Sequence, residues 1–172
     1  MKKIILIAVL LIFGFGFSQT KQTIFDVARN GDVELAKKML KENKNVFNQR
    51  NIEGYSPLLL ACYRGNFELA KLMIRNKADI NVNSTMGTPL MAAVVKGNLD
   101  IVKLLLSKKA DVNLSDENGT TALIYATMFK NKDIILALLG SNADKSMKDK
   151  TGKTAFEYAV NSADETIINV LK

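Results

Sequence analysis

The chain contains no histidine and no tryptophan, and it has only two prolines and one cysteine in 172 residues. Without histidine there is no Ser-His-Asp or Cys-His relay, no imidazole metal ligand, and no side chain whose unperturbed pKa lies near neutrality. The single cysteine, Cys62, can form no disulfide within the chain and cannot build a cysteine-rich zinc site. These absences predict a protein that is not an enzyme and that uses no cofactor and no metal.

The overall composition is that of an ordinary folded domain. Charged residues make up 24% of the chain and hydrophobic residues 48%, which is too apolar a balance for a disordered protein. The length suits one domain with a hydrophobic core of its own.

The N-terminal segment has the three-part layout of a secretory signal peptide. Residues 1–3 are a short basic start, and residues 4–17 follow without a charge. Gly16 and Ser18 then place small residues at −3 and −1 of a cut before Gln19. Fourteen helical residues span about 21 Å, which is short of the ~30 Å hydrocarbon core. The alternative is an uncleaved N-terminal anchor.

We therefore divide the chain into a signal peptide at 1–18 and a folded domain at 19–172. Cleavage would leave 22 basic and 17 acidic residues, so the net charge would fall from +7 to +5. The expected location is outside the cytoplasm, in the periplasm if the host is Gram-negative and otherwise secreted. Because one cysteine gives no disulfide, the core alone must stabilise the domain.

Glycines and prolines recur with a period near 33 residues, which indicates a repeat array. One glycine series has spacings of 33, 32 and 33, a second has spacings of 34 and 32, and the two prolines are 32 apart. The positions are Gly54, Gly87, Gly119 and Gly152; Gly31, Gly65 and Gly97; and Pro57 and Pro89. The tetrapeptide Ala-Asp-Ile-Asn at 78–81 also returns as Ala-Asp-Val-Asn at 110–113.

Each unit is predicted to contain two short helices. Ser56 caps the first helix, and Pro57 stands at its first position, where a missing N–H costs nothing. Gly65 ends that helix in a left-handed conformation, and Asn66 caps the second helix. The other units carry the same pattern at Thr88-Pro89, Gly97 and Asn98, and then at Thr121, Asn131 and Thr154.

This pattern resembles the ankyrin repeat, a β-turn plus two antiparallel helices with a T-P-L-H-x-A signature. The segments nearest to the family pattern are Gly54-Tyr-Ser-Pro-Leu-Leu-Leu-Ala, Gly87-Thr-Pro-Leu-Met-Ala-Ala and Gly97-Asn-Leu-Asp-Ile-Val-Lys-Leu-Leu-Leu. The resemblance covers essentially all of 22–172. It implies an all-α repeat solenoid of five stacked ankyrin repeats, near 22–50, 51–83, 84–115, 116–148 and 149–172.

Two departures from the ankyrin pattern bear on the structure. The signature histidine is replaced by Leu59, Met91, Ile124 and Glu157, so apolar contact should replace the usual Thr–His hydrogen bond in three units. Lys130 stands where the glycine between the helices is expected. Either this lysine adopts the left-handed conformation at a cost of about 1 kcal/mol, or the turn shifts to Asn131.

The resemblance also implies a binding surface, because ankyrin partners contact the turn tips and the exposed side of the first helices. The tips carry Ile52, Glu53, Tyr55, Thr85, Met86, Glu117, Asn118, Thr120, Lys150 and Lys153. The ends of the first helices carry Tyr63, Arg64, Val95, Lys96, Met128 and Phe129. We expect the best contact patch at Ile52, Tyr55, Tyr63 and Arg64, since aromatic residues and Arg are enriched in interface cores. Val95, Met128 and Phe129 either join this surface or tuck between helices.

Lysines recur at one phase of the repeat, at 37–38, 71–77 and 103–109, and would line the outer face of the second helices. This face is either simply solvated or attracts anionic lipid, envelope polysaccharide or an acidic partner. Nucleic acid is not an expected partner, because the basic residues alternate with acidic ones and lack aromatic residues that would stack on bases.

The sequence thus favours a monomeric, non-catalytic protein-protein interaction module. It would be a secreted or periplasmic solenoid that binds a partner protein on its concave face, in one version as an inhibitor or immunity-type protein. The alternative is an envelope or membrane-surface structural protein that uses the lysine-rich outer face.

Overall fold

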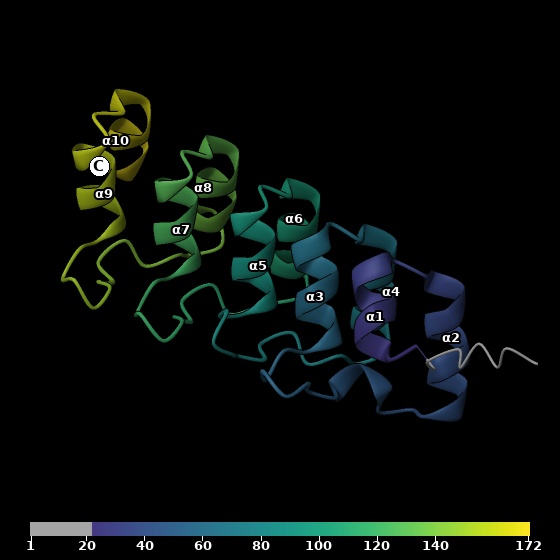
Figure 1. The fold of residues 1–172 in the computed structure, drawn as a ribbon. Helices are drawn as coiled ribbons and strands as arrows, with labels where there is room; N and C mark the ends of the chain where they lie inside the picture. The colour runs from purple at the N-terminus through teal and green to yellow at the C-terminus, as the bar shows by residue number, and fades with distance from the viewer. Residues whose placement is uncertain (1–21) are drawn as a thin grey trace, which may run out of the picture.

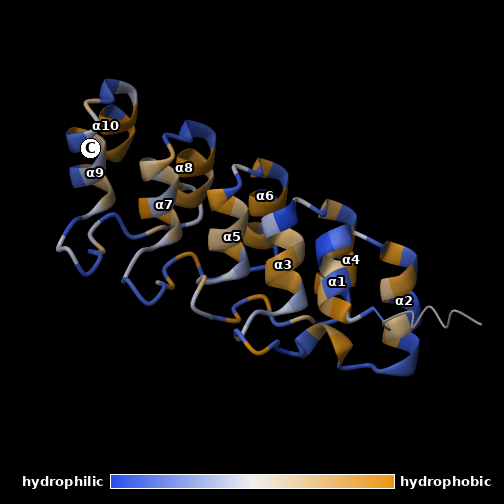
Figure 2. Cartoon of the chain, in the orientation of Figure 1, coloured by the Kyte–Doolittle hydropathy of each residue, from blue (hydrophilic) through white to orange (hydrophobic). Residues whose placement is uncertain are grey.

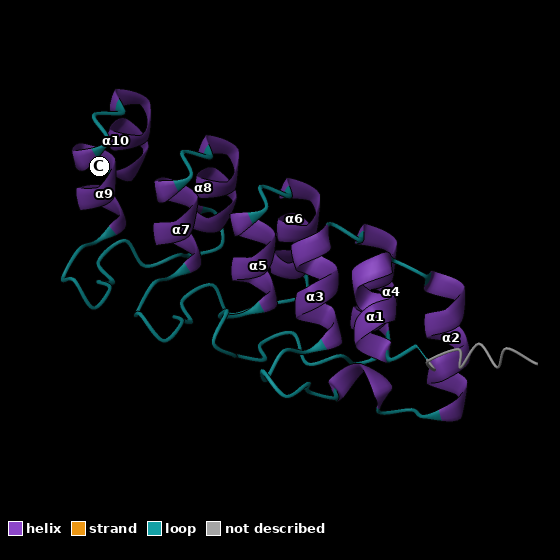
Figure 3. Ribbon diagram, in the orientation of Figure 1, coloured by secondary structure: helices purple, strands orange, loops and turns teal. Residues whose placement is uncertain are grey.

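The computed structural model describes residues 22–172, so the predicted signal peptide lies outside the described residues. The described residues form ten α-helices and one 3₁₀ turn, with no strand beyond isolated bridges (Figures 1 and 3). The elements are α1 (Ile24–Asn30), α2 (Val33–Glu42), η1 (Val46–Asn48), α3 (Pro57–Arg64), α4 (Phe67–Arg75), α5 (Pro89–Val95), α6 (Leu99–Ser107), α7 (Ala122–Met128), α8 (Lys132–Leu139), α9 (Ala155–Asn161) and α10 (Glu165–Leu171).

The helices stack as pairs in two layers (Figure 1). Each odd-numbered helix packs against the even-numbered helix that follows it and against the odd-numbered helices beside it, and the even-numbered helices form the second layer. The long loops run along one edge of the stack and are largely hydrophilic, whereas the helices carry most of the hydrophobic residues (Figure 2). The predicted all-α repeat solenoid is confirmed. None of the helices in 22–172 has the length and apolar character needed to cross a membrane.

The first helix of each unit begins and ends at the residues that the sequence indicates. The Ser56 hydroxyl accepts a hydrogen bond from the Leu59 amide at 3.1 Å, and Pro57 occupies the first turn. Gly65 then ends α3 with a φ of +77°, a conformation that is easy only for glycine. Thr121 caps α7 in the same way without a proline.

The caps of the second helices differ in one unit. Asn98 and Asn131 accept a hydrogen bond from an amide in the first turn, as predicted. Asn66 makes no such bond, and its Nδ2 instead donates to the carbonyl oxygens of Ala28 and Arg29, at 2.8 and 3.3 Å. Asn66 stands at the N-cap position of α4, as predicted, but a capping bond from its side chain is absent, because this side chain satisfies the carbonyl groups at the end of α1 in the preceding unit.

The odd-numbered helices form the centre of the core. Leu59, Met91 and Ile124, which replace the signature histidine, are each at most 1% exposed, so apolar packing does take the place of a hydrogen bond. Glu157 acts differently, because its carboxylate accepts hydrogen bonds from the Thr154 amide and hydroxyl. Burial at these positions is worth about 1.5–3 kcal/mol for each large side chain.

Asparagines tie each long loop to the next one. In three successive units an asparagine Oδ1 accepts a hydrogen bond from the amide of an aspartate about 31 residues later. The bonds are Asp79 to Asn48 at 2.8 Å, Asp111 to Asn81 at 2.9 Å, and Asp144 to Asn113 at 2.8 Å. Each of these aspartates also accepts from the amide two residues on. The recurring Ala-Asp-x-Asn motif is therefore a connector between units.

Lys130 occupies the position between α7 and α8 that glycine fills in earlier units. Its φ is +55°, so the lysine itself adopts the left-handed conformation and the turn does not shift to Asn131. Crowding between the Cβ and the carbonyl oxygen makes this conformation costly for any residue except glycine. The unit that contains α7 and α8 therefore carries a local strain.

Replacing Lys130 with Gly should raise the free energy of unfolding by about 1 kcal/mol, because glycine has no Cβ to crowd at positive φ. Urea unfolding followed by circular dichroism would measure the change. The control is Lys103→Gly, an exposed position inside α6, which should lose about 1 kcal/mol through the low helix propensity of glycine. A Lys130→Gly protein less stable than wild type would contradict the left-handed turn.

Candidate functional site

The predicted contact residues of the loops lie at the tips of the turns that precede the odd-numbered helices. Ile52 is fully exposed, at 104% of its reference area, and six other tip residues are exposed: Glu53, Thr85, Glu117, Asn118, Lys150 and Lys153. Tyr55 and Met86 are half-buried and pack against the core. These tips and the odd-numbered helices form one side of the stack (Figure 1).

Thr120 is a correction to the predicted surface. It was expected at the tip, but it is only 7% exposed. The chain has already turned back to the core at this point, and the Thr120 amide donates to the Asp116 carboxylate at 2.9 Å. Thr120 thus holds the turn in shape and presents little surface to a partner.

The ends of the odd-numbered helices present a row of larger side chains. Arg64, Lys96 and Phe129 occupy equivalent positions of successive units, and all three are exposed. Met128 and Phe129 are 46% and 53% exposed, so they do not tuck between helices. The apolar part of the row is therefore at the end of α7.

Aromatic contacts order this row. The Phe129 ring stacks on Tyr125, with ring centroids 6.5 Å apart and planes inclined by 15°. In the neighbouring units the Lys96 ammonium lies 4.8 Å from the centroid of the Tyr63 ring. A cation over a tyrosine face is worth about 0.5–1 kcal/mol at an exposed site. Both contacts restrict side chains that would otherwise move freely in solvent.

The structure changes which residues offer exposed apolar surface. Of the favoured patch, Ile52 and Arg64 are exposed but Tyr55 and Tyr63 are half-buried. Met128 and Phe129, outside that patch, are exposed. Ile52 and Tyr63 also lie at opposite ends of α3, since one precedes the helix and the other is in its last turn. They are separated by roughly 10 Å or more along the helix axis.

Sequence reasoning also missed one exposed apolar residue on the odd-numbered helices. Val160 in α9 is 48% exposed, although its equivalents Cys62, Val94 and Thr127 are at most 1% exposed. Those three are covered by the odd-numbered helix of the next unit, and α9 belongs to the last helix pair of the described chain. The signal in the sequence that could have indicated the exposure of Val160 is the place of its unit in the array.

Two buried carboxylates hold the last two turn tips against their helices. The Tyr125 hydroxyl donates to Asp116 at 2.6 Å, and the Tyr158 hydroxyl donates to Asp149 at 2.5 Å. Burial, and then the Asp116 carboxylate, raise the pKa of Tyr125 to about 12. Hydrogen bonds from Tyr158 and Thr151 lower the pKa of Asp149 to about 2. These groups serve the shape of the turns.

The described residues offer little for other chemistry. No group of three or more Cys, Asp or Glu side chains in 22–172 is placed to hold a metal ion. Cys62 is completely buried, and burial raises the pKa of its thiol far above the ordinary range, so the nucleophilic thiolate does not form near neutral pH. The side formed by the tips and odd-numbered helices remains the candidate site.

The Asp149 contact gives stability an acid dependence. The folded pKa of about 2 lies below the ordinary value of 3.8, so the contribution is present above pH 4 and is lost as the pH falls from 4 towards 2. Asp149→Asn should therefore lower the urea midpoint at pH 7 and flatten its fall below pH 4. Urea titrations at pH 7, 4 and 2.5 would show this. An Asp149→Asn protein as acid-sensitive as wild type would contradict the contact. The exposed carboxylate of Glu117, changed to Gln, provides the control.

Comparison with known proteins agrees with the geometry. A protein of Dictyostelium discoideum named acyl-CoA-binding domain-containing protein 6 homolog is 40% identical over 61 residues, which are 36% of this chain and 21% of that protein. An ankyrin repeat protein of Rickettsia bellii is 35% identical over 78 residues, which are 40% of this chain and 46% of that protein. The aligned region thus spans less than half the length of each of these relatives.

The family model described as ankyrin repeats in three copies matches residues 24–116 and 97–172. The two windows overlap over 97–116, which contains α6, and together run from the first described helix to the last. The stack of helix pairs, the glycine turns and this match agree over the whole described region, and the chain belongs to the ankyrin repeat family.

Proposed function

We propose that this protein is a non-catalytic binding module that holds a partner protein on the side formed by its turn tips and odd-numbered helices. Ankyrin repeats indicate a protein–protein interaction module, and they generally bind protein partners. The family consists typically of non-enzymatic modules. The proposal for this chain adds the surface that is used and the chemistry of the partner.

The exposed pair Met128 and Phe129 carries this proposal. Apart from Val160 in the last helix pair, the large apolar side chains elsewhere on the described odd-numbered helices are buried or half-buried, but these two leave about half of their area in water. Phe129 is also held in place by its stacking on Tyr125. An ordered aromatic side chain loses little conformational entropy on binding, which favours it as an interface anchor.

Basic residues flank this anchor and suggest the charge of the partner. Arg64 and Lys96 precede Phe129 in the same row, and Lys130 follows it in the chain, and all three are exposed. Within 22–172 none of them forms an ion pair with a carboxylate. The matching partner surface would carry an apolar side chain beside acidic groups, because complementary charge favours encounter and fixes register.

Truncating the anchor should weaken partner binding. Met128→Ala with Phe129→Ala should raise Kd about 30-fold or more, corresponding to about 2 kcal/mol. The partner would first be captured from the native envelope fraction, and Kd would then be measured by calorimetry. The matched control is Leu136→Ala in α8, which removes an apolar side chain of similar exposure, 48%, from the other layer. An unchanged Kd in the folded double variant would overturn the assignment.

The proposed location is outside the cytoplasm, in the periplasm or in the medium. The support is the basic start, the 14-residue apolar run at 4–17 and the small residues before Gln19. There the module could act as an inhibitor or immunity-type protein that covers a secreted enzyme or toxin. This version rests on the same surface and requires a partner from the same compartment.

The mature protein recovered from its host should begin at Gln19. Mass spectrometry of the intact chain would measure this directly, because cleavage removes residues 1–18 as one piece. Recovery of the uncut 172-residue chain from the membrane fraction would show the anchor alternative instead, and recovery from the cytosol would refute export.

A further inference from the structure

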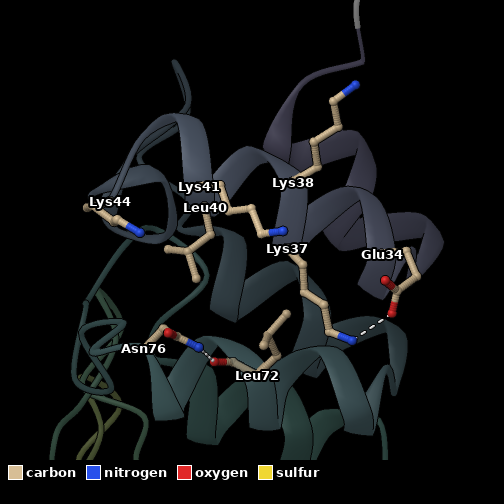
Figure 4. A pocket seen from close by; sticks show the side chains of 8 residues that line it. All are labelled: Glu34, Lys37, Lys38, Leu40, Lys41, Lys44, Leu72 and Asn76. Carbon is tan, nitrogen blue, oxygen red and sulfur yellow. Dashed lines mark hydrogen bonds and ion pairs between the residues drawn. The ribbon is translucent and has the colours of Figure 1, made fainter.

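The even-numbered layer contains an open hollow between α2 and α4, far along the chain from the proposed anchor (Figure 4). Its volume is about 440 Å³. The apolar side chains of Leu40 and Leu72 line it together with basic residues of α2 and the loop that follows. A smaller hollow of about 210 Å³ adjoins it and shares Leu40 and Lys44.

The two hollows gather basic side chains from two neighbouring units. Lys37, Lys41 and Lys44 come from the first unit, and Arg75 and Lys77 come from the second. Figure 4 shows the Lys41 and Lys44 side chains directed over the hollow. The surplus of cations is large, because the lining includes one carboxylate.

That carboxylate, Glu34, is already paired with Lys37, whose Nζ lies 2.6 Å from its Oε1. In the part of the chain that the structure describes, Lys41, Lys44 and Lys77 have no carboxylate within ion-pair distance. Their positive potential is therefore uncompensated by the protein and faces solvent.

The lysines that line the two hollows differ from other lysines of the same layer in their surroundings. Lys71 lies 3.9 Å from the Glu68 carboxylate and 5.7 Å from the centre of the Phe67 ring, so its charge is partly met within its own helix. Lys103, Lys108 and Lys109 are exposed but line neither hollow. Within 22–172, the α2–α4 hollow differs from these lysines in placing unpaired cations around apolar surface, an arrangement suited to lysines at a lipid interface.

We propose that the α2–α4 hollow, together with the smaller hollow that adjoins it, docks the protein on a membrane surface rich in anionic phospholipid. Lysine ammonium groups attract phosphate headgroups, and the leucines of the hollow accept the apolar part of the interface. The hollow lies between α2 of the first helix pair and α4 of the second, so it belongs to the part of the chain that remains after cleavage before Gln19. This inference does not depend on the partner binding proposed for the side formed by the turn tips and odd-numbered helices.

The test compares binding of the mature chain, residues 19–172, to vesicles of phosphatidylglycerol and to vesicles of phosphatidylcholine, measured by co-sedimentation at low salt. The ratio of the two partition coefficients isolates the electrostatic part, because apolar contacts contribute to both. Lys41→Gln, Lys44→Gln and Lys77→Gln together should lower this ratio roughly 100-fold, about fivefold for each charge near the surface. The ratio for wild type should also fall as salt is added.

The matched control is Lys103→Gln, Lys108→Gln and Lys109→Gln, which removes the same charge from the same layer. Each set includes one lysine with positive φ, Lys77 or Lys109, so the backbone effect is also matched. An equal loss in both sets would overturn the proposal, because it would show attraction by net charge alone. A wild-type ratio near one would overturn it as well. If the hollow bound soluble polyphosphate but the protein did not bind vesicles, the membrane proposal would be overturned and the ligand would be a soluble polyanion.

Discussion

One helix pair cannot bury its own apolar faces, and the whole structure depends on neighbouring pairs to cover them. A helix such as α3 has six of its eight residues buried, and no single partner helix could cover them all. Burial is complete only because α1 and α5 pack on either side while α4 covers a third face. The energy of each unit is therefore shared with its neighbours, and the chain behaves as a nearly one-dimensional array. Every other feature adjusts the geometry of this stack.

The polar contacts set the spacing that burial alone leaves open. Apolar faces tolerate sliding, because the hydrophobic effect has no direction. Hydrogen bonds from the amide of an aspartate in one unit to an asparagine side chain in the previous unit are directional, and they recur at 2.8–2.9 Å. Asn66 does the same work on the other side of the stack by bonding to the end of α1. Register is thus fixed by side-chain amides.

Much of the fold could be predicted from the sequence, because glycine, proline and hydroxyl residues act locally. The caps at Ser56 and Thr121 depend on a few adjacent residues, so their roles follow from the repeat alone. For Lys130 the repeat marked the turn but left two conformations open, and the structure has the left-handed one. Asn66 was misassigned because its partner lies 38 residues away, and no local signal distinguishes it from Asn98.

The candidate site was harder to predict, because exposure depends on neighbours. Thr120 and Asn118 belong to the same turn, yet the first is buried and the second exposed. Tyr63 and Met128 are equivalent in the repeat, yet the first is half-buried, with the Lys96 ammonium over its ring, and the second is exposed. Likewise the α2–α4 hollow joins lysines of the first unit to Leu72 and Asn76 of the second, which are far from those lysines in the chain. Exposure and surface hollows can therefore be determined only once the units are packed against one another.

The asparagine connectors also separate architecture from recognition. Each one bonds to a backbone N–H of the next loop, and every residue except proline has such a group. Exposed side chains at the tips, such as Ile52, take no part in these bonds. These exposed residues can therefore be exchanged without breaking the connectors. The scaffold can thus keep its shape while the side chains that determine its binding specificity change.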